Sequence, residues 1–190
     1  MKNKLLILLG HSNCGKSYTV KELLKTTNFK TCVSHTTRKK GIGEVEGVDY
    51  YYVTDDEFDK IKFVEKREYN TFENINGKKT EAVWKYGLSE IELKDLSKPR
   101  VVIVDLHGAM ELSEYLNNEV VIVYLEIDEK IRMDRALSRN RESIEEIKRR
   151  FADDKKVFKG VENLVHAAVN TEQSVQAVCE QILQVYNYYN

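Results

Sequence analysis

The chain carries the stretch LLILLGHSNCGKS at residues 5–17, and this stretch determines the expected fold. Its first five residues are apolar and have the length of a buried strand, and the residues after Ser17 indicate a helix. Between them lies the pattern G-x-x-x-x-G-K-[ST], in the strand–loop–helix setting that a phosphate-binding loop requires. Glycine at both ends lets the backbone turn its N–H groups inward around an anion, beside the positive end of a helix dipole. The stretch therefore predicts binding of a nucleoside triphosphate.

Each residue of this loop has a predicted role in the triphosphate site. Lys16 is expected to reach the outer phosphates as a catalytic residue, and the Ser17 hydroxyl is expected to ligate Mg²⁺. The remaining residues contribute their backbone N–H groups to the anion. The predicted ATP site consists of Gly10, His11, Ser12, Asn13, Cys14, Gly15, Lys16 and Ser17.

Composition limits the class of protein. At 190 residues the chain has the length of a single compact domain with a substantial core. Its 30 basic and 31 acidic side chains give a formal net charge of −1, which argues against nucleic acid or an acidic membrane as partner. The three cysteines are widely spaced, which favours a reduced, cytoplasmic protein over a disulfide scaffold or a zinc site. The short apolar run near Met1 predicts a core strand rather than a signal peptide or a membrane helix.

Strand-like and helix-like segments alternate along much of the chain. Apolar runs at Leu5–Leu9, Val101–Val104 and Val120–Leu125 predict buried parallel strands. Helical patterns lie at Ser17–Leu24, Ala109–Leu116, Glu129–Ser138, Ser143–Phe158 and Ser174–Tyr186. This alternation predicts a three-layer α/β/α fold with a central parallel sheet and with ligands at the carboxyl ends of its strands.

Residues 32–98 interrupt the alternation. They are rich in Thr, Tyr, Gly and charge, with short strand-like pieces such as Val48–Val53, and they predict an α+β module inserted into a core of about 1–31 and 99–190. The Asn-Gly pair within Asn74–Lys78 predicts an exposed turn. The last residues, Tyr186–Asn190, are expected to be a frayed end.

Two segments of the insert resemble the guanylate kinase family. Ser34-His35-Thr36-Thr37-Arg38 matches its [SV]-[SH]-T-T-R segment, and Gly43–Tyr50 matches G-E-x-x-G-x-D-Y. A serine hydroxyl, an arginine fork and a tyrosine hydroxyl suit the phosphate of a second, acceptor nucleotide. By resemblance, Ser34, Arg38 and Tyr50 bind that phosphate, and Arg38 also acts in catalysis. The resemblance extends from Leu5 to about Asn170.

Further matches assign residues to the acceptor nucleotide. Phe63-Val64-Glu65 resembles the family's F-[IV]-E, whose glutamate accepts hydrogen bonds from guanine, and Glu68 is the alternative because the spacing from the preceding segment is short. Tyr86 resembles the tyrosine of Y-Y-G-[TS], which touches the acceptor phosphate. Asp105 matches the aspartate of D-[VIM]-Q-G, and the resemblance implies that it serves the acceptor base, or Mg²⁺ through water.

A basic segment at about residues 132–155 resembles the family's helical lid. The family pattern is L-x-x-R-x-x-x-R-G, a short acidic segment and K-R-L, and residues 133–151 follow that outline. The resemblance implies that Arg135, Arg139 and Arg150 fold over the triphosphate as catalytic residues. We interpret the remaining arginines as a solvated helical face, the usual explanation of such a run. They are Arg132, Arg141 and Arg149.

The chain departs from the family pattern in three places. Gly41 replaces a second phosphate-binding arginine, and Leu88 lies where a Ser or Thr usually contacts the base, although Ser89 is adjacent. The loop Asn70–Lys85 is unusual, and Arg67–Thr71 beside it resembles a bacterial and phage-associated branch of guanylate kinase-like proteins. The prediction of phosphoryl transfer does not depend on these positions. The preference for a particular base remains open.

The combined prediction is an enzyme that transfers a phosphoryl group from ATP, with Mg²⁺, to a nucleoside monophosphate, GMP or dGMP by resemblance. A kinase for another (deoxy)nucleotide is the alternative within the class. A non-catalytic guanylate kinase-like binding module is disfavoured because Lys16 and Ser17 are intact. An ATPase acting on nucleic acid would need a basic stripe with interleaved aromatic residues, and the net charge of −1 argues against this class. The expected partners are nucleotides, with neither nucleic acid nor membrane, and the chain is expected to be a monomer or homodimer in the cytoplasm.

Overall fold

The computed structural model describes residues 3–41, 43–75, 78–139 and 143–190. The chain divides into two compact units. The first combines Met1–Thr31 with Leu96–Asn190, and the second is Cys32–Asp95.

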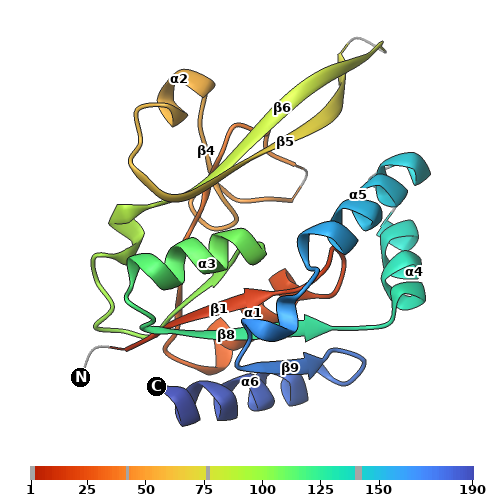
Figure 1. Ribbon diagram of the computed structural model, residues 1–190. Helices are drawn as coiled ribbons and strands as arrows, with labels where there is room; N and C mark the ends of the chain where they lie inside the picture. The colour runs from red at the N-terminus through yellow and green to blue at the C-terminus, as the bar shows by residue number, and fades with distance from the viewer. Residues whose placement is uncertain (1–2, 42, 76–77, 140–142) are drawn as a thin grey trace. The chain divides into compact units, whose positions relative to one another are not determined.

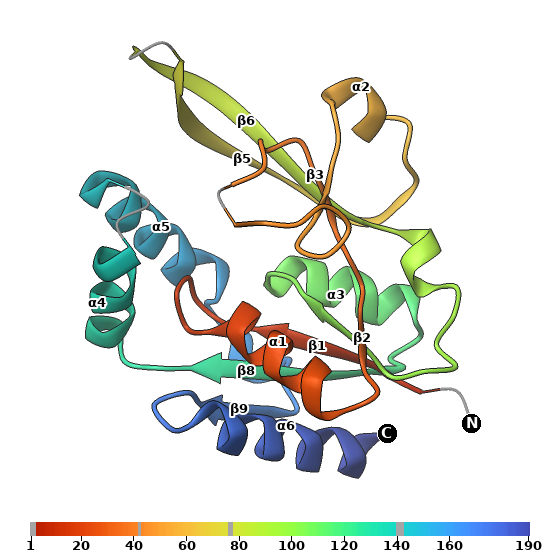
Figure 2. The same cartoon turned by 180° about the vertical axis from the view of Figure 1, so that it is seen from behind.

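The first unit is built on a five-stranded sheet in which every pairing is parallel. In spatial order the strands are β2 (Lys30–Thr31), β7 (Arg100–Ile103), β1 (Leu5–Leu9), β8 (Val120–Glu126) and β9 (Ala167–Asn170). Helices α1 (Lys16–Thr26) and α6 (Val175–Tyr189) cover one face of this sheet, and α3 (Leu106–Tyr115) covers the other (Figures 1 and 2). The predicted three-layer α/β/α fold with a central parallel sheet is confirmed.

Strand β1 occupies the centre of the sheet because both of its faces are apolar. All five of its residues are fully buried, as expected for a strand covered by helices on both sides. Leu6 and Leu8 share one hydrophobic cluster with Leu23 of α1 and Ile182 of α6. This core fixes the carboxyl end of β1, from which the glycine loop begins.

The carboxyl end of the chain is ordered as helix, so the predicted frayed end at Tyr186–Asn190 is wrong. Helix α6 continues to Tyr189, and the side chain of Tyr186 is only 3% exposed. Its hydroxyl donates to the carbonyl oxygen of Lys4 at 2.9 Å, and the Lys4 Nζ donates to the carbonyl oxygen of Tyr189 at 2.7 Å. Tyr186 lies one helical turn beyond Ile182 on the buried face, so the apolar stripe of α6 extends to its last turn.

Two helices with a small core of their own follow β8. They are α4 (Glu129–Arg139) and α5 (Ile144–Val157), and a short 3₁₀ turn, η2 (Val161–Asn163), follows them. Ala136, Ile147 and Phe151 are buried together between the two helices. The Ser143 hydroxyl accepts from the Glu146 N–H and so caps the start of α5.

The second unit contains a four-stranded sheet with the order β4-β3-β6-β5. Its elements are β3 (His35–Thr36), β4 (Tyr51–Tyr52), α2 (Asp55–Phe58), β5 (Phe63–Ile75), β6 (Lys78–Ser89) and the 3₁₀ turn η1 (Glu90–Leu93). The strand-like piece at Val48–Val53 is strand only at β4, because the N–H groups of Val48 and Asp49 donate to the Val45 carbonyl in a turn.

The unusual segment Asn70–Lys85 is mostly an antiparallel hairpin rather than a loop. The pairing of β5 with β6 continues from Asn70 opposite Val83 to Ile75 opposite Lys78. Asn76 and Gly77, in the predicted turn, lie outside the described residues. Arg141, which was interpreted as solvated, lies outside them as well.

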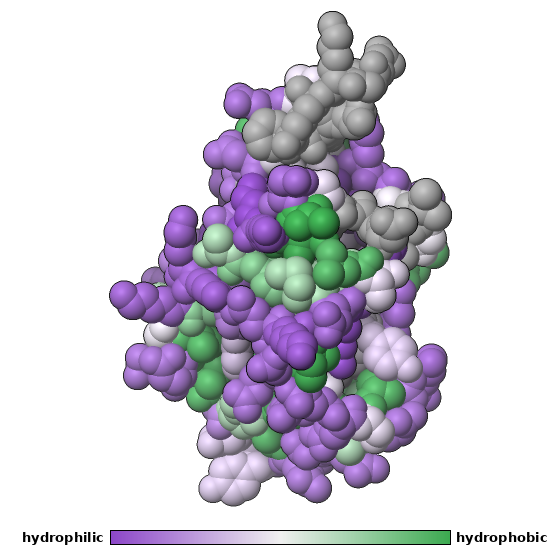
Figure 3. All heavy atoms as spheres, turned by 90° about the vertical axis from the view of Figure 1, so that its right-hand side faces the viewer, coloured by the Kyte–Doolittle hydropathy of each residue, from purple (hydrophilic) through white to green (hydrophobic). Residues whose placement is uncertain are grey.

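The surface in one view is mostly hydrophilic (Figure 3). Hydrophilic side chains cover most of the face seen in Figure 3, with apolar side chains interspersed among them. Within the described ranges, no helix has both the length and the apolar character needed to cross a membrane.

Candidate functional site

The glycine loop between β1 and α1 adopts a backbone that residues with side chains rarely adopt. Gly10 has φ 150°, Asn13 has φ 64°, and Gly15, which caps α1 in the left-handed conformation, has φ 106°. The loop is held at its centre by Cys14, whose side chain is buried and whose carbonyl oxygen accepts from the Thr171 hydroxyl at 2.9 Å. The backbone of the loop is therefore anchored to the rest of the first unit through Cys14.

Replacing Gly10 with alanine tests how tightly the loop is built. A Cβ atom at this position would lie 2.6 Å from both the Cys14 Sγ and the Leu125 carbonyl oxygen. Overpacking of this kind costs about 1–3 kcal/mol, and the φ strain adds about 1–2 kcal/mol. We expect Gly10→Ala to lower the free energy of unfolding in urea by about 3 kcal/mol.

Gly160→Ala is the control for this experiment, because Gly160 has φ 83° and a Cβ there would have only one neighbour, at 3.8 Å. It should therefore show the φ strain alone, about 1 kcal/mol. Equal losses of stability in the two variants would contradict the close approach of the loop to β8.

Lys16 folds back across the glycine loop. Its Nζ donates to the carbonyl oxygens of Gly10 at 2.5 Å and His11 at 2.9 Å. Ser17 is exposed in the first turn of α1. The ammonium group and the N-terminus of α1 thus present positive charge at the same loop.

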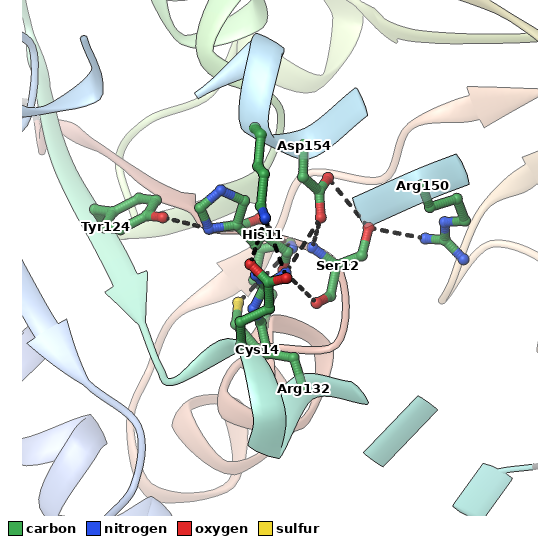
Figure 4. Close-up of polar contacts among 11 residues, drawn as sticks. His11, Ser12, Cys14, Tyr124, Arg132, Arg150 and Asp154 are labelled. Carbon is green, nitrogen blue, oxygen red and sulfur yellow. Dashed lines mark hydrogen bonds and ion pairs between the residues drawn. The ribbon is translucent and has the colours of Figure 1, made fainter. Parts of the chain in front are cut away.

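The three predicted lid arginines all contact the glycine loop. Arg135 lies 3.5 Å from the Cys14 carbonyl oxygen, and the Arg139 Nη1 donates to the Asn13 Oδ1 at 3.2 Å. Arg150 of α5 lies with its Nη2 3.4 Å from the Ser12 Oγ (Figure 4). These contacts are long enough to be readily exchanged for an anion.

Arg132 is not solvated, so its interpretation from the sequence was wrong. The residue is only 3% exposed, and its guanidinium lies over the Phe151 ring, 4.5 Å from the centroid. It occurs one helical turn before Arg135, and the spacing of 132, 135 and 139 places three arginines on one face of α4. That spacing was a signal in the sequence that could have identified Arg132.

Asp154 is a second residue of this site that sequence reasoning missed. Its Oδ2 accepts from the Ser12 N–H at 2.6 Å, and its Oδ1 accepts from the Ser12 hydroxyl at 3.2 Å (Figure 4). Asp153, next to it, binds Arg149 instead, at 2.7 Å. Nothing in the sequence distinguishes the two neighbouring carboxylates.

His11 is held in its neutral form beside the loop. Burial and the nearby Arg132 lower the pKa of His11, and burial raises the pKa of Tyr124 to about 12. The Tyr124 hydroxyl lies 2.6 Å from the His11 Nδ1. A neutral imidazole carries one proton, so the direction of this hydrogen bond follows from which ring nitrogen of His11 holds it.

In the second unit, Arg38 is a fixed cation. Its Nη2 donates to the Glu44 Oε1 at 2.8 Å, and its guanidinium lies 5.4 Å from the centre of the Tyr50 ring. Burial alone would lower the pKa of Arg38, but the hydrogen bond to Glu44 and the nearby Tyr86 raise it on balance. Arg38 therefore remains charged at any pH at which the protein is folded.

Glu44 holds this arginine in place. Burial raises the pKa of Glu44, but hydrogen bonds from Arg38, the Gly41 N–H and the Tyr52 hydroxyl lower it to about 2. The Gly41 N–H and the Tyr52 hydroxyl lie 2.7 Å and 2.8 Å from its Oε2. The carboxylate is thus ionised at neutral pH and orients the guanidinium.

Two tyrosines complete the cluster around Arg38. The rings of Tyr50 and Tyr86 meet edge to face with their centroids 5.7 Å apart. Ser34 lies just before β3, where its carbonyl oxygen accepts from the Tyr51 N–H at 2.9 Å. The structure therefore gathers Arg38, Tyr50 and Tyr86 in space.

The two candidate base-binding glutamates differ in burial. Glu65 is only 6% exposed on β5, opposite the fully buried Leu88, whereas Glu68 is exposed. Ser89 accepts from the Ile91 N–H through its hydroxyl, so it caps η1. A buried carboxylate requires hydrogen-bond donors to offset the loss of water. Glu65 is therefore the better candidate of the two for contact with the base.

Asp105 belongs to the first unit, at the carboxyl end of β7. Its side chain caps α3, with the Oδ1 accepting from the Gly108 N–H at 2.8 Å. This cap accounts for an aspartate at the start of the helix without any ligand.

Comparison with known proteins identifies the relatives of the chain. The family model described as guanylate kinase matches residues 2–188. The chain belongs to the guanylate kinase family. A guanylate kinase of Clostridium tetani is 32% identical over 171 residues, covering 89% of this chain and 79% of the relative. A guanylate kinase of Rickettsia typhi is 33% identical over 159 residues, covering 79% of this chain and 74% of the relative.

Solved structures support the fold of this guanylate kinase family member. The guanylate kinase from Anaplasma phagocytophilum superposes with a TM-score of 0.67 at 20% identity, covering 98% of this chain and 86% of the other. A gluconokinase from Sinorhizobium meliloti superposes with a TM-score of 0.53 at 14% identity, covering 97% of this chain and 92% of the gluconokinase. At these identities the likeness establishes the fold alone.

Proposed function

We propose that this guanylate kinase family member transfers the γ-phosphoryl group of ATP to GMP or dGMP. The observation that carries the proposal is the convergence of four cationic side chains on the glycine loop. Lys16 comes from α1, Arg135 and Arg139 come from α4, and Arg150 comes from α5. A concave backbone lined by four cations suits the polyanionic triphosphate of ATP.

The donor site would consist of the loop Gly10–Ser17. Its N–H groups and the start of α1 would hold the inner phosphates, and Lys16 would exchange its two carbonyl partners for phosphate oxygens. Arg135, Arg139 and Arg150, in the proposed lid of about residues 132–155, would neutralise charge on the transferred group.

The residues present also fit Mg²⁺. Within the described residues, no cluster of three or more His, Cys, Asp or Glu side chains could hold a metal ion. Mg²⁺ commonly binds through few protein oxygens together with phosphates and water, and the exposed Ser17 hydroxyl suits that role. Mg²⁺ would supply charge neutralisation between the outer phosphates.

The acceptor site would lie in the unit Cys32–Asp95, the proposed monophosphate-binding insert. Arg38, held by Glu44, would present its remaining N–H donors to the acceptor phosphate, with the hydroxyls of Ser34, Tyr50 and Tyr86 beside it. Glu65 would accept from the base. No general base is needed, because a monophosphate already presents an anionic oxygen to the γ-phosphorus.

A coupled assay of ADP release tests the proposal directly. With ATP and Mg²⁺, the protein should release ADP in the presence of GMP or dGMP and only slowly with water alone. Equal ADP release with and without any monophosphate would identify an ATPase. No release with any nucleotide would favour a non-catalytic binding module.

Replacing Arg38 with alanine should weaken the acceptor site selectively. A hydrogen bond to a charged group contributes about 1.5–3 kcal/mol, so the KM for GMP should rise by about 10-fold to 100-fold. The KM for ATP should change little. With glycine at position 41, no neighbouring arginine compensates for the loss.

Lys39→Ala is the matched control for Arg38→Ala, since Lys39 is an exposed cation at the next position. It should leave both KM values near those of the wild type. Loss of affinity for both nucleotides in Arg38→Ala would show that this arginine belongs to a different site.

A further inference from the structure

Arg132 is a buried cation with poor hydrogen bonding. Its side chain is 4% exposed, yet its Nη atoms lie 3.5 Å from the Ser12 carbonyl oxygen, 3.6 Å from the Asp154 Oδ2 and 3.8 Å from the Glu129 Oε2. Within the described residues, its Nε has no hydrogen-bond partner. Taking a guanidinium out of water without short hydrogen bonds is costly, so its position requires an explanation.

The residue is also unusual for its place in the lid. When Arg135 and Arg139 take the arginine positions of the pattern L-x-x-R-x-x-x-R-G, the leucine position falls on Arg132. A leucine there could pack on Phe151 as Arg132 does. Packing between α4 and α5 therefore does not account for a charged residue at this position.

The surroundings of Arg132 point to an anion at Ser12. Asp154 accepts from both the N–H and the hydroxyl of Ser12, and Arg132 and Arg150 approach the same residue from two helices (Figure 4). The Asp154 carboxylate accepts from a loop N–H, one guanidinium lies 3.6 Å from it, and a second guanidinium contacts the same serine. A phosphate oxygen would have a similar environment there.

We infer that Arg132 is a further ATP-binding residue, which contacts the terminal phosphate, and that Asp154 takes the place of this phosphate when no nucleotide is bound. This inference rests on the proposed ATP-binding role of the loop. The N–H groups at the start of α1 hold the inner phosphates, so the anion beside Ser12, at the other end of the loop, is the terminal one. Asp154 must then move aside, because two anions cannot share one guanidinium and one N–H.

The difference between ATP and ADP tests this role, because ADP lacks the terminal phosphate. The affinities of the Arg132→Leu variant for ATP and ADP are measured by calorimetry with Mg²⁺ and without acceptor. We expect ATP binding to weaken at least about tenfold, the lower range for a lost hydrogen bond to a charged group, and ADP binding to change less than about threefold.

Arg149→Leu is the matched control, because Arg149 pairs with Glu146 and Asp153 on its own helix. It should leave both affinities within about threefold of the wild type, the same margin set for ADP. Equal weakening of ATP and ADP in folded Arg132→Leu would assign Arg132 a structural role and overturn the inference. Unchanged ATP binding would overturn it as well.

Asp154→Asn provides an independent test that does not require Arg132→Leu to fold. Removing the competing charge should strengthen ATP binding relative to ADP binding, and an unchanged or lower ratio would overturn the inference. Wild-type protein that binds neither nucleotide would instead refute the proposed function. Wild-type binding together with an insensitive Arg132→Leu variant would refute only the role of Arg132.

Discussion

Replacing Lys16 with alanine is expected to lower kcat by about 10²-fold or more while the protein stays folded, the scale for removing one preorganised donor to the transition state. The ammonium group lies against the carbonyl oxygens of Gly10 and His11, at the loop where negative charge would develop during transfer.

The fold should tolerate this change because other contacts anchor the loop. The Thr171 hydroxyl binds the Cys14 carbonyl oxygen, and the Cys14 side chain lies in the core. The melting temperature of Lys16→Ala, followed by circular dichroism, should therefore remain close to that of the wild type.

Lys25→Ala is the control on the same helix, since Lys25 is exposed and pairs with Glu22 at 3.1 Å. Its kcat should equal that of the wild type. A kcat for Lys16→Ala within threefold of the wild type, with an unchanged melting temperature, would rule out the assigned role of the glycine loop.

The core of the fold was predictable because its signals are local. The run Leu5–Leu9 is apolar on both faces, and such a run has few alternatives to a central parallel strand. The loop that follows has its conformation dictated by Gly10 and Gly15, which no other residue type could easily replace. The predicted strands and long helices therefore end within a few residues of the observed ones.

The errors concern residues whose environment depends on distant parts of the chain. The helical spacing of Arg132 marked the face of α4 on which it lies, but its burial depends on partners elsewhere in the chain. Phe151, on another helix, packs against its guanidinium, and Ser12 lies beside it. Tyr186 is ordered because the Lys4 carbonyl oxygen, at the opposite end of the chain, accepts its hydroxyl. Such partners have no signature in the local sequence.

The grouping of Arg38, Tyr50 and Tyr86 could be predicted only through the resemblance to a family. Physical reasoning identifies Arg38 and Tyr50 as suitable for a phosphate, but so are many exposed pairs of these residue types. The role of Glu44 in fixing Arg38 was not foreseen, although the two residues are only six positions apart. Its ion pair forms within a turn whose geometry the composition does not specify.

The second large effect concerns the base of the acceptor. We expect GMP or dGMP to exceed AMP by at least about 10²-fold in kcat/KM. The Glu65 carboxylate can accept from guanine N1–H and N2–H together, whereas adenine offers no such pair of donors on that edge. Glu65 is only 6% exposed, and with adenine bound its carboxylate would lack the two guanine N–H donors. The cost of removing the charge from water would then not be offset by those hydrogen bonds.

Glu65→Gln should therefore reduce the preference for guanine, since an amide N–H₂ facing the guanine donors cannot accept from both. Glu68→Gln is the matched control, three residues along the same strand and exposed. The measurement is kcat/KM for GMP and for AMP with each variant. Loss of the preference in Glu68→Gln but not in Glu65→Gln would place the base against Glu68.

Leu88 sets a limit on the size of this preference. It lies directly opposite Glu65 on β6 and is fully buried, where a Ser or Thr would offer a hydroxyl to the base. The adjacent Ser89 lies opposite Phe63 rather than Glu65, and its hydroxyl oxygen accepts from the Ile91 N–H. The guanine preference should consequently be smaller than in a relative with Ser or Thr at this position. If AMP, CMP or dTMP proves the best acceptor in the same assay, the assignment of guanine fails, while the assignment of phosphoryl transfer to a monophosphate stands.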